Sequence, residues 1–140
     1  MKTIKQLTLA IVMVLTAIVS YGQQSTISVE ITNIQSEEGT IIIGLFDSKD
    51  DFLKTAIKRD KIKPKKGEMK ISFDNIPTGT YTVSVIHDEN NNDDLDMNFM
   101  GIPSEPYGIS MDGKSMFGPP SYEKAKFEVT NKNVDLKISL

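Results

Sequence analysis

The sequence predicts an all-β protein, an antiparallel β-sandwich of about seven strands with one short helix and a long ordered loop. Apolar and polar residues alternate along it with the period of two that half-buried strands show. These alternating runs recur at intervals of roughly ten residues, which is the strand spacing of sandwiches. Because no internal repeat or low-complexity linker divides the chain, we expect one domain after the N-terminal segment.

The first three expected strands cover residues 26–32, 39–47 and 68–76. In "TISVEIT" and "EMKISFDNI" apolar residues take alternate positions, so each stretch predicts a strand with one buried face. "GTIIIGLFD" is apolar on both faces, which predicts a central strand covered on two sides.

One short helix is expected between Phe46 and Gly67, in "DSKDDFLKTAIKRDKIKPKKGE". Ser48 is a suitable N-cap, and the two aspartates that follow it favour the first turn of a helix. Four apolar residues recur at helical spacing, namely Phe52, Leu53, Ala56 and Ile57. The helix should end before Pro64, which cannot continue it.

The second half of the chain opens with a turn and a strand in "IPTGTYTVSVIHD", residues 76–88. Pro77 fixes its own φ and Gly79 permits a positive φ, as in a tight turn. The last two runs, "AKFEVT" at 125–130 and "VDLKISL" at 134–140, are joined by a short polar turn. They predict a closing hairpin.

The strand signal disappears between Asp88 and Ser121. Long loops inside compact domains tend to be functional or disordered. This one has too much apolar material for a disordered linker, including Phe99, Met100, Ile102, Tyr107, Ile109, Met111, Met116, Phe117 and Tyr122. We therefore expect it to fold over one end of the sandwich, stiffened by its four prolines.

Residues 1–22 have the layout of a secretory signal peptide. Lys2 and Lys5 precede an apolar run that is shorter than the about 20 residues of a membrane-spanning helix. We expect cleavage after Gly22 and a mature domain of residues 23–140, periplasmic or extracellular and not inserted in the membrane. Because the sequence has no cysteine, it offers no acceptor for a lipid anchor.

Composition excludes several function classes. The mature part would carry 14 basic and 19 acidic side chains, a net charge of −5, which argues against nucleic acid or anionic membranes as partners. The absence of cysteine excludes disulfides and thiolate chemistry. A single histidine leaves too few nitrogen ligands for a zinc site.

The acidic stretch "HDENNNDDLD", residues 87–96, predicts a cation loop. Its oxygen-bearing residues fall at alternate positions, as in calcium loops, and the predicted ligands are Asp88, Asn90, Asn92, Asp94 through its carbonyl, and Asp96. Two positions depart from the helix-hand pattern, because Asp93 stands where glycine is preferred and Phe99 where a bidentate glutamate is. With two neutral asparagines, we expect a calcium dissociation constant of about 10⁻⁴ to 10⁻³ M.

The same residues also have a purely structural interpretation. Asn and Asp side chains bond backbone amides two residues on and so cap their own turns. The mutual repulsion of five carboxylates within residues 88–96 favours the cation, unless they are splayed into solvent. Both interpretations stay open, and the second predicts a packed loop without any ligand.

A ligand surface or an active site is the remaining question. Candidates beside the acidic stretch for a surface that binds a peptide, a carbohydrate or a protein are His87, Asn98, Glu105, Tyr107 and Ser110. Packing of the loop against the sandwich is the alternative for this region. A hydrolase would pair His87 with nearby acids, but no "GxSxG" elbow occurs, so we expect a non-enzymatic module.

Ordered motifs from residue 76 to 127 resemble one family. "IPTGTY", "HDENNNDDLD", "NFMGIPSEPYGIS" and "GPPSYEKAKF" resemble the bacterial secreted proteins grouped as domain of unknown function 2141. The resemblance covers essentially the whole mature chain and implies an immunoglobulin-like or transthyretin-like sandwich with no established activity. The matching positions are His87, Asp88, Asn90, Asn92, Leu95, Asp96, Asn98, Phe99, Gly101, Pro103, Glu105, Tyr107, Gly108 and Ser110. Asn91 and Asp93 stand where relatives often have glycine, although Asn and Asp tolerate left-handed backbone better than most residues.

Overall fold

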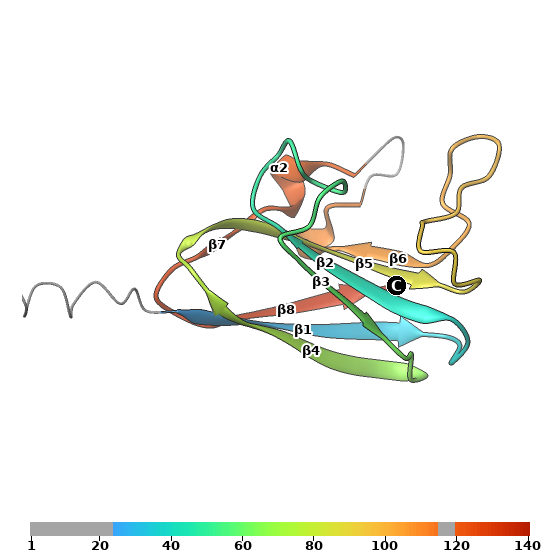
Figure 1. The fold of residues 1–140 in the computed structure, drawn as a ribbon, viewed down its shortest axis with the longest axis horizontal. Coiled ribbons are helices and arrows are strands. Elements are labelled where there is room, and N and C mark those ends of the chain that lie inside the picture. The colour runs from blue at the N-terminus through green and yellow to red at the C-terminus, as the bar shows by residue number, and fades with distance from the viewer. Residues whose placement is uncertain (1–23, 115–119) are drawn as a thin grey trace, which may run out of the picture.

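Two β-sheets pack face to face in the computed structural model, which describes residues 24–114 and 120–140 (Figure 1). One sheet has the order β4 (Gly67–Ile76), β1 (Ser25–Ile34), β8 (Val134–Ser139). The other has the order β3 (Lys58–Ile62), β2 (Thr40–Phe46), β5 (Gly79–Asp88), and β5 also pairs with β6 (Tyr107–Ile109) and β7 (Phe127–Val129). The described elements further include a 3-10 turn, η1 (Ser110–Asp112), and helix α2 (Tyr122–Ala125).

Alternation along the strands builds the core between the sheets. On β1, Ile27, Val29 and Ile31 are fully buried, while the residues between them are half-exposed. β2 and β5 contribute the facing side chains, Ile41, Ile43, Leu45, Tyr81, Val83 and Val85. Burying one such aliphatic side chain stabilises the fold by roughly 1.5–3 kcal/mol. The core thereby fixes both sheets and the loops attached to them.

The predicted β-sandwich is confirmed, with eight strands in the described residues. Strand β2 is central and almost entirely buried, as its two apolar faces predicted. One pairing departs from an antiparallel sandwich, because β8 runs parallel to β1 with Ile31 opposite Ile138. The immunoglobulin-like or transthyretin-like subtype remains a prediction.

The position predicted for the helix was wrong, and the short helix of the fold is α2 instead. Ser48 does cap a turn, since its Oγ accepts the backbone N–H of Asp51 over 3.2 Å. The turn ends at Leu53, whose φ of 60° is left-handed and stops a helix. Beyond it, residues 58–62 gain more by pairing with the edge of β2 as strand β3. Only Phe52 of the predicted apolar stripe is buried.

The predicted closing hairpin was also wrong. β7 pairs with β5 in one sheet, whereas β8 pairs with β1 in the other, so the turn between them crosses the sandwich. Ser25 Oγ donates to the carbonyl of Thr130 over 2.8 Å, and the N–H of Thr26 donates to Asn133 Oδ1 over 2.9 Å. These bonds anchor the crossover to the start of β1. Apolar side chains alternate toward the core both in a hairpin and in two strands of opposite sheets, so the sequence pattern does not distinguish the two arrangements.

The long loop folds over the sandwich only in part: Tyr107 and Ile109 join the sheet in β6, whereas Phe99, Met100, Ile102 and Met111 are exposed, against the expectation that they pack on it. From Asp88 it passes through an isolated β-bridge between Met97 and Pro103 and then enters β6 and η1. Within residues 24–114 and 120–140, no helix has the length and apolarity to cross a membrane. The predicted signal peptide, together with Met116, Phe117 and Pro119, lies outside the described residues.

Candidate functional site

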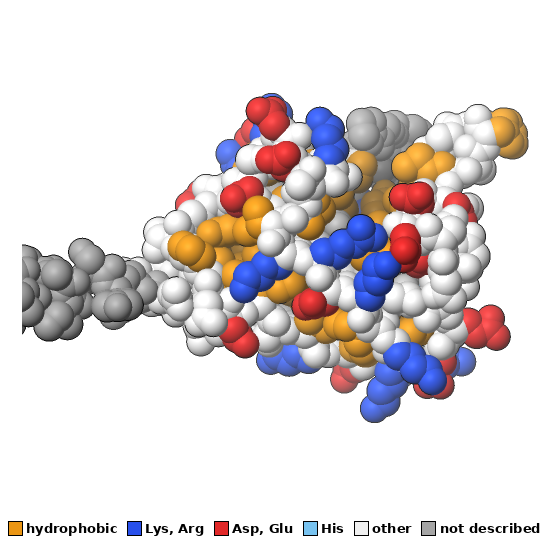
Figure 2. Space-filling model, viewed as in Figure 1, with side chains coloured by type: hydrophobic (Ala, Val, Ile, Leu, Met, Phe, Trp, Pro, Cys, Tyr) orange, Lys and Arg blue, Asp and Glu red, His pale blue; other side chains and the backbone are white. Residues whose placement is uncertain are grey.

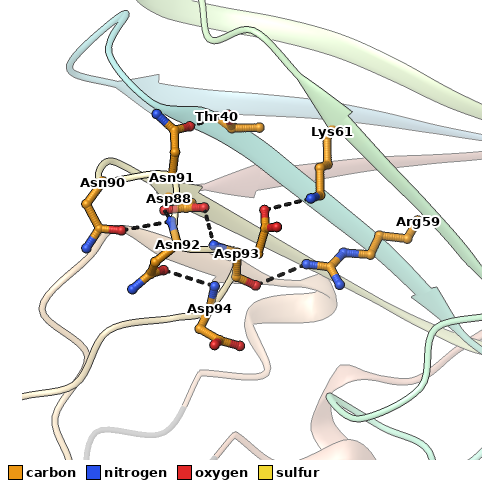
Figure 3. Close-up of polar contacts among 9 residues, drawn as sticks. All are labelled: Thr40, Arg59, Lys61, Asp88, Asn90, Asn91, Asn92, Asp93 and Asp94. Atoms are coloured by element: carbon orange, nitrogen blue, oxygen red, sulfur yellow. Dashed lines mark hydrogen bonds and ion pairs between the residues drawn. The ribbon is translucent and has the colours of Figure 1, made fainter.

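The acidic loop, residues 88–96, starts where β5 ends and is curled by a buried carboxylate. Asp88 is 0% exposed, and its Oδ1 and Oδ2 accept the backbone N–H groups of Asn92 over 3.2 Å and Asp93 over 2.8 Å (Figure 3). Gly39 makes room for this strand end, because a Cβ there would lie 2.1 Å from the carbonyl oxygen of Asp88. The acidic loop therefore begins in close contact with the turn at Gly39, which precedes β2.

Side-chain oxygens of the asparagines cap two successive turns of the acidic loop. Asn90 Oδ1 accepts the N–H of Asn92 over 3.0 Å, and Asn92 Oδ1 accepts the N–H of Asp94 over 3.0 Å (Figure 3). Asn91 and Asp93 have left-handed φ values of 59° and 71°. Both asparagine side chains thus bond backbone amides two residues on, as turn-capping residues do, whereas Asp88 bonds amides four and five residues on.

Three of the five predicted calcium ligands converge. The side-chain amides of Asn90 and Asn92 both donate to the carboxylate of Asp96, the latter over 2.8 Å. Asp88 uses its oxygens on backbone N–H groups, and the exposed Asp94, predicted as a carbonyl ligand, contacts this cluster through its backbone N–H, which donates to Asn92 Oδ1. In the described part of the chain, no group of three or more His, Asp or Glu side chains is placed to hold a metal ion.

Glu105 closes the acidic loop from its far side. Its buried carboxylate accepts the N–H of Glu89 at Oε1 over 2.9 Å and the N–H of Asp96 at Oε2 over 3.1 Å. Two orphan backbone donors that lie sixteen and nine residues away in sequence are satisfied by one side chain. Charge-assisted bonds of this kind are stronger than neutral ones, so Glu105 is a structural clamp.

Strand β3 supplies the positive charge that meets the acidic loop. Lys61 Nζ lies 2.6 Å from Asp93 Oδ1, and Arg59 donates to the carbonyl of Asp93 over 3.1 Å (Figure 3). The hydrogen bond from Lys61 holds the pKa of the Asp93 carboxyl below its ordinary value, and the charge of Arg59 acts in the same direction. The loop is thus tied to the edge strand at its acidic turn.

A groove of about 530 Å³ lies over the outer face of the five-stranded sheet. The side chains that alternate with the core residues of β2 and β5 form its floor with β6, and they include Ile42, Gly44, Phe46, Ser84, Ile86 and Ile109. Figure 2 shows apolar side chains beside the charged groups of this face. Ligand sites are most often apolar concavities of this size with a few polar groups at the edge.

Charged side chains of both signs line the groove. The turn after β2 and strand β3 contribute Lys54 and Arg59, while the acidic loop contributes Asp93 and Asp94. A groove with this rim can orient a ligand that has an apolar body and polar ends.

The residues predicted for a ligand surface are dispersed. Tyr107 lines the groove, and Asn98 caps the exposed turn that follows the acidic loop. His87 is 1% exposed, and its Nε2 is 2.8 Å from the carbonyl oxygen of Glu38. Ser110 is buried, donating to the carbonyl of Ala125 over 2.6 Å and accepting the N–H of Val83 over 3.0 Å. Glu105 is the clamp described above.

Sequence reasoning missed the groove floor. Its signal was present in "GTIIIGLFD", whose outward Ile42 and Phe46 made the second face of β2 apolar. That face was interpreted only as packing. The contribution of Arg59 was hidden because its stretch was assigned to the end of a helix rather than to an edge strand.

The motifs of the long loop are thus placed along β5, the acidic loop and β6. The family model described as "Uncharacterized protein conserved in bacteria (DUF2141)" matches residues 29–137. This chain belongs to the DUF2141 family. The match confirms the resemblance and spans every described strand from β2 to β7. No curated protein and no solved structure matches this DUF2141 chain.

Proposed function

We propose that this DUF2141 protein is an exported, non-enzymatic binding module whose groove receives an apolar group of its ligand. The observation that carries the proposal is the groove of about 530 Å³ over the outer face of the five-stranded sheet. A sheet face that is covered by packing would have no such hollow beside its apolar residues. Here the half-buried Ile86 and the buried Ile42 lie at the bottom of the hollow.

The chemistry of the groove favours a polypeptide ligand over a carbohydrate. Its floor is mainly aliphatic, and the sequence has no tryptophan to stack on a sugar ring. Tyr107 is the aromatic candidate, but Lys114 Nζ lies 5.0 Å from the centroid of its ring and makes a cation–π contact there. An apolar side chain of a peptide or of a protein surface, flanked by polar backbone, matches both the floor and the charged rim.

The hydrolase alternative, which needs His87 as a general base, has weaker support. A base must come within hydrogen-bond reach of the proton that it abstracts. His87 is buried, and its Nε2 lies against a backbone carbonyl rather than facing the groove. This geometry supports a structural role for the ring, in which it ties β5 to the turn before β2.

Calcium remains a proposal for the acidic loop, which forms one wall of the groove. The convergence of Asn90, Asn92 and Asp96 supports it. To bind the ion, the two amides would present their oxygens in place of the N–H groups that face Asp96, because calcium prefers oxygen ligands. A bound ion would order the groove wall rather than act on the ligand.

The groove is tested with the apolar fluorophore 1-anilinonaphthalene-8-sulfonate at a protein concentration of about 1 μM. We expect saturable fluorescence that is lost in Ile86→Glu, because a carboxylate then occupies the apolar floor. Ile57→Glu is the matched control, since Ile57 is exposed, lies between β2 and β3 and does not line the groove. Equal melting midpoints of the two variants would show that both fold.

Two results would contradict the proposal. One is the absence of saturable fluorescence with the wild-type protein, and the other is unchanged binding by Ile86→Glu. Turnover of ester or glycoside substrates that disappears in His87→Ala, but not in Ile86→Glu, would instead favour the hydrolase.

A further inference from the structure

An apolar tip, residues 97–102, projects from the acidic loop. Four of its side chains are exposed, Met97, Phe99, Met100 and Ile102. Phe99 is 98% exposed, so almost none of its ring touches the rest of the described chain. The loop between β5 and β6 carries this tip away from the sandwich (Figures 1 and 2). Clustered exposed apolar side chains of this kind mark interaction sites.

The tip is held in a closed turn by the side chain and the backbone of Asn98. Asn98 Oδ1 accepts the N–H groups of Met100 over 2.9 Å and Ile102 over 3.1 Å. The N–H of Asn98 donates to the carbonyl of Ile102 over 2.8 Å, and the N–H of Gly101 donates to the carbonyl of Asn98 over 2.9 Å. Such a closed turn presents Phe99 without the entropy cost of ordering a flexible loop on binding.

The tip and the groove are neighbours on the same side of the molecule. Met97, Gly101 and Pro103 line the groove, whereas Phe99 is almost fully exposed and is not part of the lining. When an apolar tip lies beside an apolar groove, a two-fold axis can place the tip of each copy in the groove of the other.

The charges around the tip and the groove favour a second copy of the protein over an anionic lipid surface as the partner. The tip follows Asp93, Asp94 and Asp96, and these carboxylates oppose approach to anionic headgroups. Lys54, from the turn after β2, also lines the groove, whereas Arg59 already contacts Asp93 of its own chain. In a reciprocal pair, the exposed Asp94 of one copy approaches Lys54 of its partner, so both the apolar and the charged surfaces are complementary.

We propose that this protein self-associates as a two-fold dimer in which Phe99 of each copy fills the groove of the other. The inference rests on the proposed function, because it names the groove's partner. The tips form a small interface, which predicts a reversible dimer rather than a permanent one.

Sedimentation equilibrium of the purified protein from about 1 μM to about 500 μM tests this, a range that brackets weak association. We expect the mass to rise toward twice the monomer value. In Phe99→Ser the dimer dissociation constant should increase at least about thirty-fold, because buried aromatic anchors dominate small interfaces. Met111→Ser is the control, since Met111 is also exposed but lies outside the tip and the groove lining.

A charge exchange checks the pairing independently of the apolar contacts. Asp94→Lys should weaken the dimer, and the double variant Asp94→Lys/Lys54→Glu should restore it. Failure of the double variant to recover association would overturn the proposed orientation.

Other outcomes separate the dimer from the groove. A wild-type protein that stays monomeric overturns the dimer, while fluorophore binding lost in Ile86→Glu would still uphold the groove. A dimer that persists in both Ile86→Glu and Phe99→Ser overturns the inference by assigning association to another surface. Sedimentation of a monomeric wild type, but not Phe99→Ser, with phosphatidylcholine vesicles would assign the tip to lipid and also overturn it.

Discussion

The backbone N–H of Asp96 donates to Oε2 of Glu105 over 3.1 Å, so a buried carboxylate holds the end of the acidic loop against the start of the next segment. The other oxygen of Glu105 holds the N–H of Glu89 at the beginning of the loop. One side chain therefore joins both ends of the groove's acidic wall. The groove and the tip both depend on this wall, which gives Glu105 an influence beyond its own contacts.

Glu105→Ala should lower the free energy of unfolding by about 1–3 kcal/mol, because it leaves two backbone N–H groups without their acceptor. Chemical denaturation measures this loss. Glu89→Ala is the control, since the Glu89 side chain is exposed, and its effect should stay within about 0.5 kcal/mol. Equal effects of the two substitutions would show that the Glu105 carboxylate does not clamp the loop.

The left-handed backbone at Asn91 gives a second prediction. Asn91→Val should cost about 1–2 kcal/mol, since a β-branched residue strains at a φ of 59°. Asn91→Gly relieves the backbone but loses the bond from Thr40 Oγ1 over 2.6 Å, so its stability should stay near that of the wild type. Thermal melts of both variants, with Thr40→Val to isolate the lost bond, measure these terms. A valine variant as stable as the glycine variant contradicts the strain.

The Lys61–Asp93 pair predicts a pH dependence at the acid end. Because Lys61 lowers the pKa of Asp93 in the folded state, the pair stabilises the fold above the unfolded-state pKa. This stabilisation disappears as the pH falls through the folded-state pKa. The melting midpoint of Lys61→Met should therefore lie below that of the wild type at neutral pH and approach it in acid.

Carbon-detected NMR titration of the Asp93 carboxyl measures the pKa directly. We expect it to rise toward its ordinary value in Lys61→Met and to stay unchanged in Lys132→Met, whose lysine is exposed and far along the chain. An Asp93 pKa that does not respond to the loss of Lys61 would show that their contact is not maintained in solution.

Calcium is tested by calorimetry on the wild-type protein and on Asp96→Ala. We expect saturable heat with a dissociation constant of about 10⁻⁴ to 10⁻³ M in the wild type alone, because Asp96 is where Asn90 and Asn92 converge. Asp112→Ala removes an acid outside the loop and should bind as the wild type does. Absence of heat at millimolar calcium would leave the acidic loop as turn chemistry only.

Strand alternation predicted most of the fold because burial on one face enforces it. The buried side chains of β1 and β4 follow the period of two that the sequence shows. Strand β2, which is apolar on both faces, is central in its sheet. Leu53 marks where prediction failed, because a left-handed residue inside an apolar stripe leaves no signal in the spacing. The competing term, pairing of β3 with the β2 edge, is a tertiary effect that local propensity does not contain.

Local chemistry in the acidic loop was predictable, whereas the groove was not. Asn90 and Asn92 make the backbone bonds that their type and spacing indicate. The groove floor joins Ile42, Ile86 and Ile109 from three strands, and their meeting depends on strand order. From the sequence, His87 and Ser110 were candidates for a ligand surface. In the structure both are buried, and their side chains hydrogen-bond the backbone of the sandwich.

The most direct test of the binding groove is a methyl NMR experiment on the protein with bound 1-anilinonaphthalene-8-sulfonate. We predict nuclear Overhauser contacts from the fluorophore to the methyl groups of Ile42, Ile86 and Ile109, which share the groove floor. The core methyls of Ile27 and Ile31, buried between the sheets, should show none. Contacts confined to residues outside the groove, or contacts to the core methyls, would contradict the central claim that the outer face of the five-stranded sheet is the binding site.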